Sequence, residues 1–421
     1  MMTVIGGCYR EFCLRPEWNQ LFGSGVRAAA AVATLLPSPS RLVTRAAERE
    51  RRTLSFLAET YGFDLDISSR PCPVEFQYDH PLTPPRLYPD RRDIGPVPPI
   101  EVDADCVLAF SFMEGAYRAA ARRLVYDPQA GRRAIPPSQA GVRSPHLAIV
   151  ANLGEARTMA ILLGGDVSVV GHPATEVGRF LLAREGAEVV VIKNGVEGAT
   201  VVTAGRTQLV PSFITPTVFP IGSGDIFSAV FAALWGEQKA DPFDAARLAS
   251  AATAHYCHTR TLPLPLDLAR LAGEYEAGNA GTRGTADRPL VYLAGPFWTL
   301  PQVWLLNESR RCLEGQDLAV FSPLHEVGLL ATNPTAEQVK EVAQADLSGL
   351  NRADAVFALL DGLDPGTLFE VGYARSRGTP VVGLAEAVPQ SALTMYEGSG
   401  CFITPDFTTA VYRAGWEARR K

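Results

Sequence analysis

Residues 220–235 of this 421-residue chain read PIGSGDIFSAVFAALW, and this stretch largely decides the fold of the first part. Small residues before an apolar helix let backbone N–H groups approach an anion, and the helix dipole favours negative charge there. Asp225 would fall in the first helical turn, where it could take a proton from a hydroxyl attacking a phosphoryl group. An equally good interpretation is an ordinary N-cap by Ser223 or Asp225.

A second decisive stretch, residues 354–374, reads DAVFALLDGLDPGTLFEVGYA. A buried strand there ends in an acidic, glycine-rich loop, and a helix follows, which is where ligands bind in parallel sheets. Asp361, Asp364 and Glu370 fall within one loop and one helical turn, and Asp346 lies on the preceding predicted helix. Clustered carboxylates raise one another's pKa and suit glycosidic chemistry, with one as nucleophile and another as proton donor.

Two other interpretations of this acidic stretch stay open at this point. Thr367-Leu-Phe-Glu370 fits a capping box, in which Glu370 would only satisfy its own helix, and spacing alone favours that interpretation. Metal ligation is the rival use of the carboxylates, but no histidine accompanies them.

The composition of the whole chain excludes several classes of protein. Hydrophobic residues make up 47% and charged residues 20%, so large cores can form and wholesale disorder is excluded. The net charge of −6 disfavours general nucleic-acid binding. The seven cysteines form no CxxC pair, which argues against a disulfide framework or structural zinc. Neither a signal peptide nor a membrane span is predicted, so we expect a cytoplasmic protein.

Short β-branched runs alternate with helix-period segments, which predicts an α/β fold with largely parallel sheets. The predicted strands are 3–5, 106–110, 147–150, 167–170, 189–192, 199–202, 291–294, 319–321, 355–359 and 380–383. The small, polar, glycine-rich residues 273–288 are predicted to link a domain at 1–272 to one at 289–421. Nine of the 32 prolines fall between Pro71 and Pro99, a segment expected to be an extended surface excursion.

Three motifs of the first domain together resemble the ribokinase-like (PfkB) carbohydrate and nucleoside kinase family. Asn152-Leu-Gly-Glu155 is similar to the N-x-x-E motif that organises Mg²⁺ and phosphate, so Glu155 is implied as an indirect metal contact. Residues 191–198, with Lys193, are similar to the strand-turn-strand beside the nucleotide. Gly222-Ser223-Gly224-Asp225 is similar to the G-x-G-D anion hole, which implies Asp225 as general base and ATP with Mg²⁺ as donor and cofactor.

The sugar side of this domain departs from the family pattern. The usual aspartate after the first strand is missing, and only Glu11 could substitute for it. The usual Gly-Gly…Asn segment appears as residues 23–28, GSGVRA, without the asparagine, and the lid strands look short. Either the phosphoryl acceptor is unusual or this domain works as a scaffold.

The second domain resembles the nucleoside 2-deoxyribosyltransferase family over residues 289–405. Three segments carry the resemblance: the opening strand and glycine turn, the second strand with its loop, and the D-x-G-x-x-x-E-x-G-Y-A signature. They are 291–297 (VYLAGPF), 321–326 (FSPLHE) and 364–374 (DPGTLFEVGYA). This resemblance implies Glu370 as the nucleophile that displaces the base, without a cofactor.

The resemblance also implies roles for other residues of the second domain. Asp346 and Asp364 are implied to contact the base and sugar hydroxyls, with one of them handling the proton of the base. Tyr292 is implied to keep Glu370 oriented. The implied substrate contacts are Gly295, Phe297, His325, Gly366 and Ser399, of which His325 is as readily structural.

One departure concerns the C-terminal asparagine that transferases of this family supply from a neighbouring subunit. The corresponding residues 396–401, YEGSGC, contain none. Ser399 with backbone N–H groups resembles instead the relatives that accept a 5′-phosphate and hydrolyse nucleotides.

The expected fold is thus a ribokinase-like three-layer domain followed by a smaller flavodoxin-like or Rossmann-like parallel-sheet domain. The leading hypothesis is a bifunctional salvage enzyme that joins a sugar or nucleoside kinase to an N-glycosidic transferase. Its expected partners are nucleosides or nucleotides, free nucleobase and ATP, and a homo-oligomer is expected from the family's shared sites. The alternatives are a nucleoside 5′-monophosphate N-glycosidase with a silent kinase-like module, and an effector that depletes nucleotides or NAD.

Overall fold

The computed structural model describes residues 1–95, 97–129, 133–166, 173–278, 288–330 and 332–420. Unit 1 comprises Met1–Thr215 and Phe219–Ala280, and unit 2 comprises Gly281–Lys421 with Pro216–Val218. Of the predicted linker 273–288, the first residues end helix α8 (Leu268–Glu274) and form strand β16 (Glu276–Ala277). The remainder at 279–287, like the predicted strand at 167–170, lies outside the described residues.

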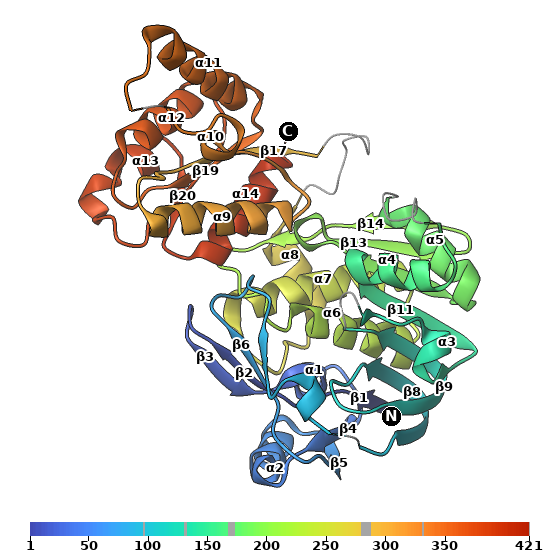
Figure 1. The fold of residues 1–421 in the computed structure, drawn as a ribbon. Helices are drawn as coiled ribbons and strands as arrows, with labels where there is room; N and C mark the ends of the chain where they lie inside the picture. Colours follow the sequence, from blue (N-terminus) through green and yellow to red (C-terminus); the bar gives the residue numbers. More distant parts are fainter. Residues whose placement is uncertain (96, 130–132, 167–172, 279–287, 331, 421) are drawn as a thin grey trace. The chain divides into compact units, whose positions relative to one another are not determined.

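A largely parallel sheet forms the centre of unit 1 (Figure 1). Its strands follow the order β14 (Thr207–Val210), β13 (Ala199–Thr203), β12 (Val189–Lys193), β11 (His146–Asn152), β9 (Tyr117–Asp127), β8 (Ile100–Phe110), β1 (Met2–Ile5), β4 (Arg41–Ala46), β5 (Asp64–Ser69). Only β13 and β14 run antiparallel to their neighbours, and the short β10 (Val142–Arg143) pairs with β9 off this path. Most of the predicted strands fall within these elements.

Helices cover both faces of this sheet, so its central strands are apolar on both sides. Along β8, Cys106, Leu108 and Phe110 face one core, while Val107 and Ala109 face the other. The first core includes α1 (Gly23–Ala31), α2 (Arg51–Tyr61), α6 (Ser223–Phe231) and α7 (Pro242–Thr259). The second includes α4 (Leu153–Leu162) and α5 (Ala174–Glu185). The predicted three-layer arrangement is therefore confirmed.

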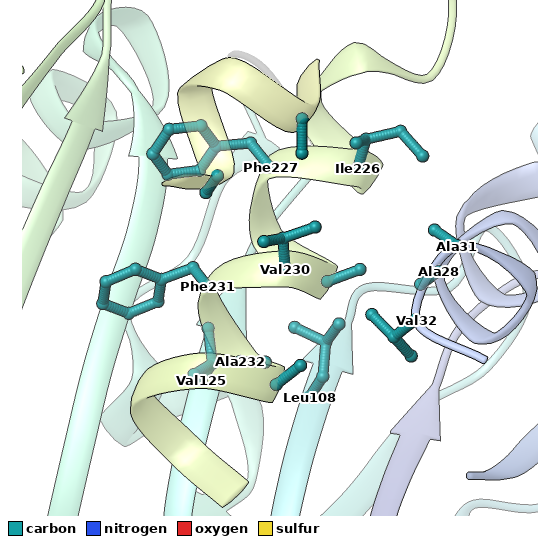
Figure 2. Close-up of a cluster of buried hydrophobic side chains, with 14 of the residues drawn as sticks. Ala28, Ala31, Val32, Leu108, Val125, Ile226, Phe227, Val230, Phe231 and Ala232 are labelled. Carbon is teal, nitrogen blue, oxygen red and sulfur yellow. The ribbon is translucent and has the colours of Figure 1, made fainter. Parts of the chain in front are cut away.

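Close packing of α1 against α6 fixes the start of α6 near the start of α1. Figure 2 shows Ala28 and Val32 at the α1 side facing Ile226 and Val230 of α6, with Leu108 of the sheet beneath. Small alanines on α1 let the two helices approach closely, which brings Arg27 of the same helix toward Asp225.

The described residues of the proline-rich segment are mostly exposed or half-buried, as expected for a surface segment, but they also contain paired strands that were not predicted. The segment contributes β6 (Glu75–Tyr78) and β7 (Arg86–Tyr88) to a four-stranded sheet with the order β3-β2-β6-β7. β2 (Arg10–Cys13) and β3 (Trp18–Leu21) supply the other half. β2 and β3 have four residues each, in agreement with the prediction of short lid strands. β6 and β7 were not predicted; the prolines before and after them leave room for strand pairing.

Unit 2 is built on an all-parallel sheet with the order β18-β17-β19-β20-β21. The strands are β17 (Leu290–Ala294), β18 (Ala319–Phe321), β19 (Ala355–Leu359), β20 (Val381–Leu384) and β21 (Phe402–Thr404). In chain order this is 2-1-3-4-5, the flavodoxin-like order predicted for this part. The strand order reverses between β17 and β19, and ligands bind at such a switch point.

Helices also cover both faces of this smaller sheet (Figure 1). Contacts place α9 (Leu300–Glu314) with α14 (Phe407–Ala418), and α11 (Ala336–Arg352) with α12 (Pro365–Ser376). Tyr292, Val356, Leu350 and Val371 share the core under α11 and α12. In neither unit does a described helix combine the length and apolarity needed to cross a membrane.

Candidate active sites

A cavity of about 350 Å³ in unit 1 brings together most of the residues predicted to bind phosphate. These residues are Asn152, Glu155, Lys193, Gly222, Gly224 and Asp225. They come from the ends of β11 and β12 and from the starts of α4 and α6. Ser223 is not among the residues that line the cavity.

The start of α6 has the geometry of an anion-binding turn rather than of a side-chain cap. Gly222 is the N-cap with φ +81°, and no side chain caps the helix, so the N-cap interpretation of Ser223 or Asp225 is wrong. The Lys193 ammonium approaches this turn, since a Cβ on Gly224 would lie 3.3 Å from its Nζ. Backbone N–H groups and an ammonium facing one space can hold a phosphate.

Lys193 and the N-x-x-E motif are fixed by hydrogen bonds. Lys193 Nζ lies 2.7 Å from Asp127 Oδ2, and this partner keeps the buried ammonium charged despite its burial. Asn152 and Glu155 form a capping box at the start of α4: the Glu155 N–H donates to Asn152 Oδ1, and the Asn152 N–H donates to Glu155 Oε2. The motif therefore shapes the helix start that lines the cavity.

Asp225 is buried, and both of its oxygens accept hydrogen bonds. Arg27 Nη1 donates to Oδ2 over 2.7 Å, and the side-chain amide of Gln129 donates to Oδ1. Burial raises the pKa of Asp225, and the nearby guanidinium of Arg27 acts against that shift. A hydroxyl that gives its proton to Asp225 would have to displace one of these two donors.

Arg27 is the residue of this site that the sequence prediction missed. Its guanidinium is fully buried and bonds the Glu11 carboxylate as well as Asp225, while Nε donates to the Tyr256 hydroxyl over 3.0 Å. Both carboxylates hold it charged, because their negative charge raises its pKa even though burial opposes this. The signal was a charged residue inside GSGVRAAAA, a helix whose other residues are small or apolar.

The site of unit 2 is centred on Glu370, which the sequence prediction took as nucleophile. The Tyr292 hydroxyl donates to Glu370 Oε1 over 2.6 Å, from the middle of β17. Helix α12 begins at Pro365 and its cap is Asp364, whose Oδ2 accepts from the Thr367 N–H. The capping-box interpretation of Glu370 is therefore wrong.

Electrostatics make Glu370 an unusual carboxylate. Burial raises its pKa to about 7; the Tyr292 hydrogen bond lowers it, while the charges of Asp346 and Asp364 raise it further. The pKa of Asp346 is also raised by burial, and its Oδ1 is buried with no hydrogen-bond partner in the described part of the chain. A carboxyl group with a raised pKa beside a nucleophile is suited to donate a proton.

Asp364 has the opposite character. Burial acts to raise its pKa, but hydrogen bonds from Trp298, Thr367 and Gly366 outweigh burial and lower the pKa. Its Oδ1 accepts from the Trp298 indole N–H over 2.9 Å, although that side chain is 69% exposed. Trp298, whose ring packs against Phe297, was not predicted, and its only sequence signal is this adjacent aromatic pair.

Two of the predicted substrate contacts have other partners. His325 lies 2.8 Å from Asn307 Oδ1 and 3.0 Å from Ser322 Oγ, which supports the structural role left open for it. The Ser399 hydroxyl donates to the Tyr396 carbonyl, and Arg375 donates to the carbonyl of Ser399. No interaction among the described residues connects either side chain to Glu370.

At two glycines of the signature segments, neighbouring atoms leave no room for a side chain. A Cβ on Gly295 would lie 3.0 Å from Leu359 at the end of β19, so a side chain there would separate the two strand ends. A Cβ on Gly366 would lie 3.1 Å from Asp364 Oδ2. Gly295 thus keeps the two strand ends close together at the switch point, and Gly366 leaves room for the Asp364 carboxylate that caps α12.

The fold and the sites thus define a protein with a kinase-like unit and a parallel-sheet unit that gathers three carboxylates, Glu370, Asp346 and Asp364. Sequence models of two families match it and confirm both resemblances. Residues 108–261 match "pfkB family carbohydrate kinase", and residues 291–403 match "Nucleoside 2-deoxyribosyltransferase". A search of the curated proteins found no match.

Solved structures similar to this chain include ribokinase from Thermotoga maritima, with 15% identity, a TM-score of 0.46 and coverage of 65% of this chain and 99% of the other. A second is a pyrophosphate-dependent kinase in the ribokinase family, complexed with a pyrophosphate analog and myo-inositol. Its sequence identity is 16% and its TM-score is 0.46, and the match covers 64% of this chain and 99% of the other. A third is a Burkholderia thailandensis nucleoside kinase in complex with inosine. Its sequence identity is 14% and its TM-score is 0.44, and the match covers 61% of this chain and 91% of the other. At these values the likenesses carry no inference about substrate.

Proposed function

We propose that unit 2 cleaves or exchanges the N-glycosidic bond of a nucleoside or deoxynucleoside, with Glu370 as nucleophile. The observation that carries this proposal is a half-buried carboxylate positioned by Tyr292 over 2.6 Å and flanked by Asp346 and Asp364. No described cation pairs with it, so nothing in that part of the chain neutralises its charge. An uncompensated carboxylate destabilises the folded protein, and a role as catalytic nucleophile would explain why it is present.

In the proposed reaction, one Glu370 oxygen attacks the anomeric carbon. The C–N bond breaks, its electron pair leaves with the base, and Asp346 supplies the proton that the departing base needs. A second base or a water molecule then attacks the anomeric carbon of the glycosyl-enzyme and releases Glu370. Tyr292 holds the reacting carboxylate in place throughout.

The test is to incubate the full chain with nucleosides, nucleoside 5′-monophosphates and NAD and to measure free base by chromatography. We expect Glu370→Gln to lower base release on the order of 10³-fold or more, because removing a nucleophile abolishes the covalent route. Glu341→Gln, an exposed position on α11, is the matched control and should leave the rate unchanged. Base release that survives in E370Q would refute Glu370 as nucleophile.

For unit 1 we infer ATP-dependent phosphoryl transfer to a sugar or nucleoside hydroxyl. The observation that favours this is the cavity in which Lys193, the α6 turn and Asp225 meet. Carboxylates suit Mg²⁺, and Glu155 at the cavity wall would help hold it. When bound, the ion would offset the negative charge of the phosphates. The residues themselves would bind phosphate through Lys193 and receive the hydroxyl proton at Asp225.

The corresponding test is ATP consumption by the full chain with a panel of sugars and nucleosides. Asp225→Asn should abolish it, since the amide cannot take a proton, while Asp244→Asn on the exposed start of α7 should not. An unchanged rate in D225N would refute Asp225 as the base, and no ATP consumption by the parent protein would support the alternative of a silent nucleotide-binding module.

A further inference from the structure

The proline-rich segment forms part of the wall of the unit 1 cavity. Phe76 and Tyr78 on β6 line it, together with Tyr9 and Met113. β6 pairs with β2 so that Phe76 lies opposite Glu11, and side chains two residues apart on a strand share one face. The Phe76 ring lies 5.3 Å from the Tyr9 ring, tilted by 49°.

Three polar side chains that line this cavity, Glu11, Asp225 and Tyr9, are already engaged within the protein. Both oxygens of Glu11 accept from Arg27, and both oxygens of Asp225 accept from Arg27 or Gln129. The Tyr9 hydroxyl donates to Glu114 over 2.8 Å and accepts from the Met113 N–H over 2.8 Å.

A ligand with many hydroxyls would therefore lose its water without finding enough partners, which is costly. The ring faces of the aromatic wall, by contrast, offer apolar surface, and the Tyr78 hydroxyl has no hydrogen-bond partner among the described residues. At about 350 Å³ the cavity is at the lower end of the size range for small-molecule sites.

We propose that this aromatic end of the cavity takes the flat heterocycle of a nucleoside acceptor rather than a polyhydroxylated sugar. The proposal rests on the phosphoryl transfer proposed for unit 1 and narrows its acceptor. Phe76, Tyr78 and Tyr9 supply the surface against which the base packs. The proline-rich segment thereby has a role in specificity.

The experiment is calorimetric titration of the full chain carrying Glu370→Gln, which prevents glycosidic turnover, with thymidine, inosine, ribose, fructose and myo-inositol. We expect nucleoside binding at two classes of site, one in each unit, and no sugar binding that depends on Phe76. Phe76→Ala should weaken one nucleoside site at least tenfold. Phe56→Ala, a 64% exposed ring on α2 outside the cavity, should change neither site.

Phe76→Leu, which keeps an apolar side chain but removes the ring, makes the same test if F76A does not fold. Nucleoside binding that is insensitive to both substitutions, or sugar binding that either one abolishes, would overturn the proposal. The failure of phosphoryl transfer is separately visible. A Phe76-dependent nucleoside site without ATP consumption would leave the acceptor assignment standing and refute the kinase activity.

Discussion

Asp225 in unit 1, which is buried, and Glu370 in unit 2, which is half-buried, are acids with opposite partners. Asp225 faces the fully buried guanidinium of Arg27, whereas Glu370 faces a neutral phenol and two further carboxylates. Burial raises the pKa of both, but only in unit 1 does a cation act against it. Unit 1 thus compensates its acid with a positive charge, while unit 2 leaves its acid close to the protonation equilibrium at neutral pH.

The largest effect that tests this difference is expected at Arg27. Arg27→Met should destabilise unit 1 by about 3–5 kcal/mol, because Glu11 and Asp225 would be left as uncompensated buried charges. Arg118→Met breaks an ion pair with Glu101 whose side chains are 74% and 70% exposed, and should cost less than about 1 kcal/mol. Denaturant unfolding measures both.

The double variant Glu11→Gln with Arg27→Met should recover part of the lost stability, since it also removes one of the stranded charges. Equal costs for R27M and R118M would show that Arg27 is not the compensating charge we describe.

A smaller change in stability is expected at Glu370, where substitution should stabilise unit 2 rather than destabilise it. Its pKa is about 7 in the folded protein, above its ordinary value, so the folded state binds the proton more tightly than the unfolded state. Unit 2 should lose stability as pH rises from about 5 to 8. Glu370→Gln should therefore be more stable than the parent at pH 8, on the order of 2 kcal/mol, and about equally stable at pH 5.

Thermal unfolding of both proteins across this pH range checks the prediction, with Glu341→Gln as control. A stability difference that is the same at pH 5 and pH 8 would mean that Glu370 does not titrate in this range.

The subtlest expected effect is a movement of the pH–rate profile of base release. Activity should rise with pH through about 7 as Glu370 ionises. Tyr292→Phe removes a hydrogen bond that lowers the pKa of Glu370, so the rise should move to higher pH. Asp346→Asn removes a charge that raises this pKa, so its rise should move to lower pH, together with a lower maximum rate.

If the pH–rate profiles of the two variants moved in the same direction, the electrostatic account of unit 2 would be contradicted. Either variant alone also perturbs packing, and the opposite signs are what separate charge from packing.

Much of the parallel sheets could be predicted from the sequence, because strands covered on both faces are continuous apolar runs such as 355–359 and 189–192. The strands β6 and β7 were not predicted, and β2 and β3 were expected only as short lid strands without bounds. They are short, mix polar with apolar residues, and in part lie among prolines, so their pairing depends on partners distant in the chain.

The candidate sites divide in the same way. Local motifs indicated Glu370, Asp225 and the glycines, because each belongs to a short motif made of neighbouring residues in the sequence. Arg27 and Trp298 were missed because their partners, Asp225 and Asp364, come from other elements. The capping alternative at Thr367 failed because Asp364 stands three residues before it and takes the cap, a choice that spacing alone does not decide.

The close approach of Gly222 and Arg27 has an evolutionary consequence. A Cβ on Gly222 would lie 2.1 Å from Arg27 Nε, so a side chain cannot be gained at 222 while arginine occupies position 27. The residue that opens the phosphate turn and the residue that neutralises the acid are therefore epistatic. Loss of Arg27 would remove this clash, but the left-handed φ of +81° would still favour glycine at position 222.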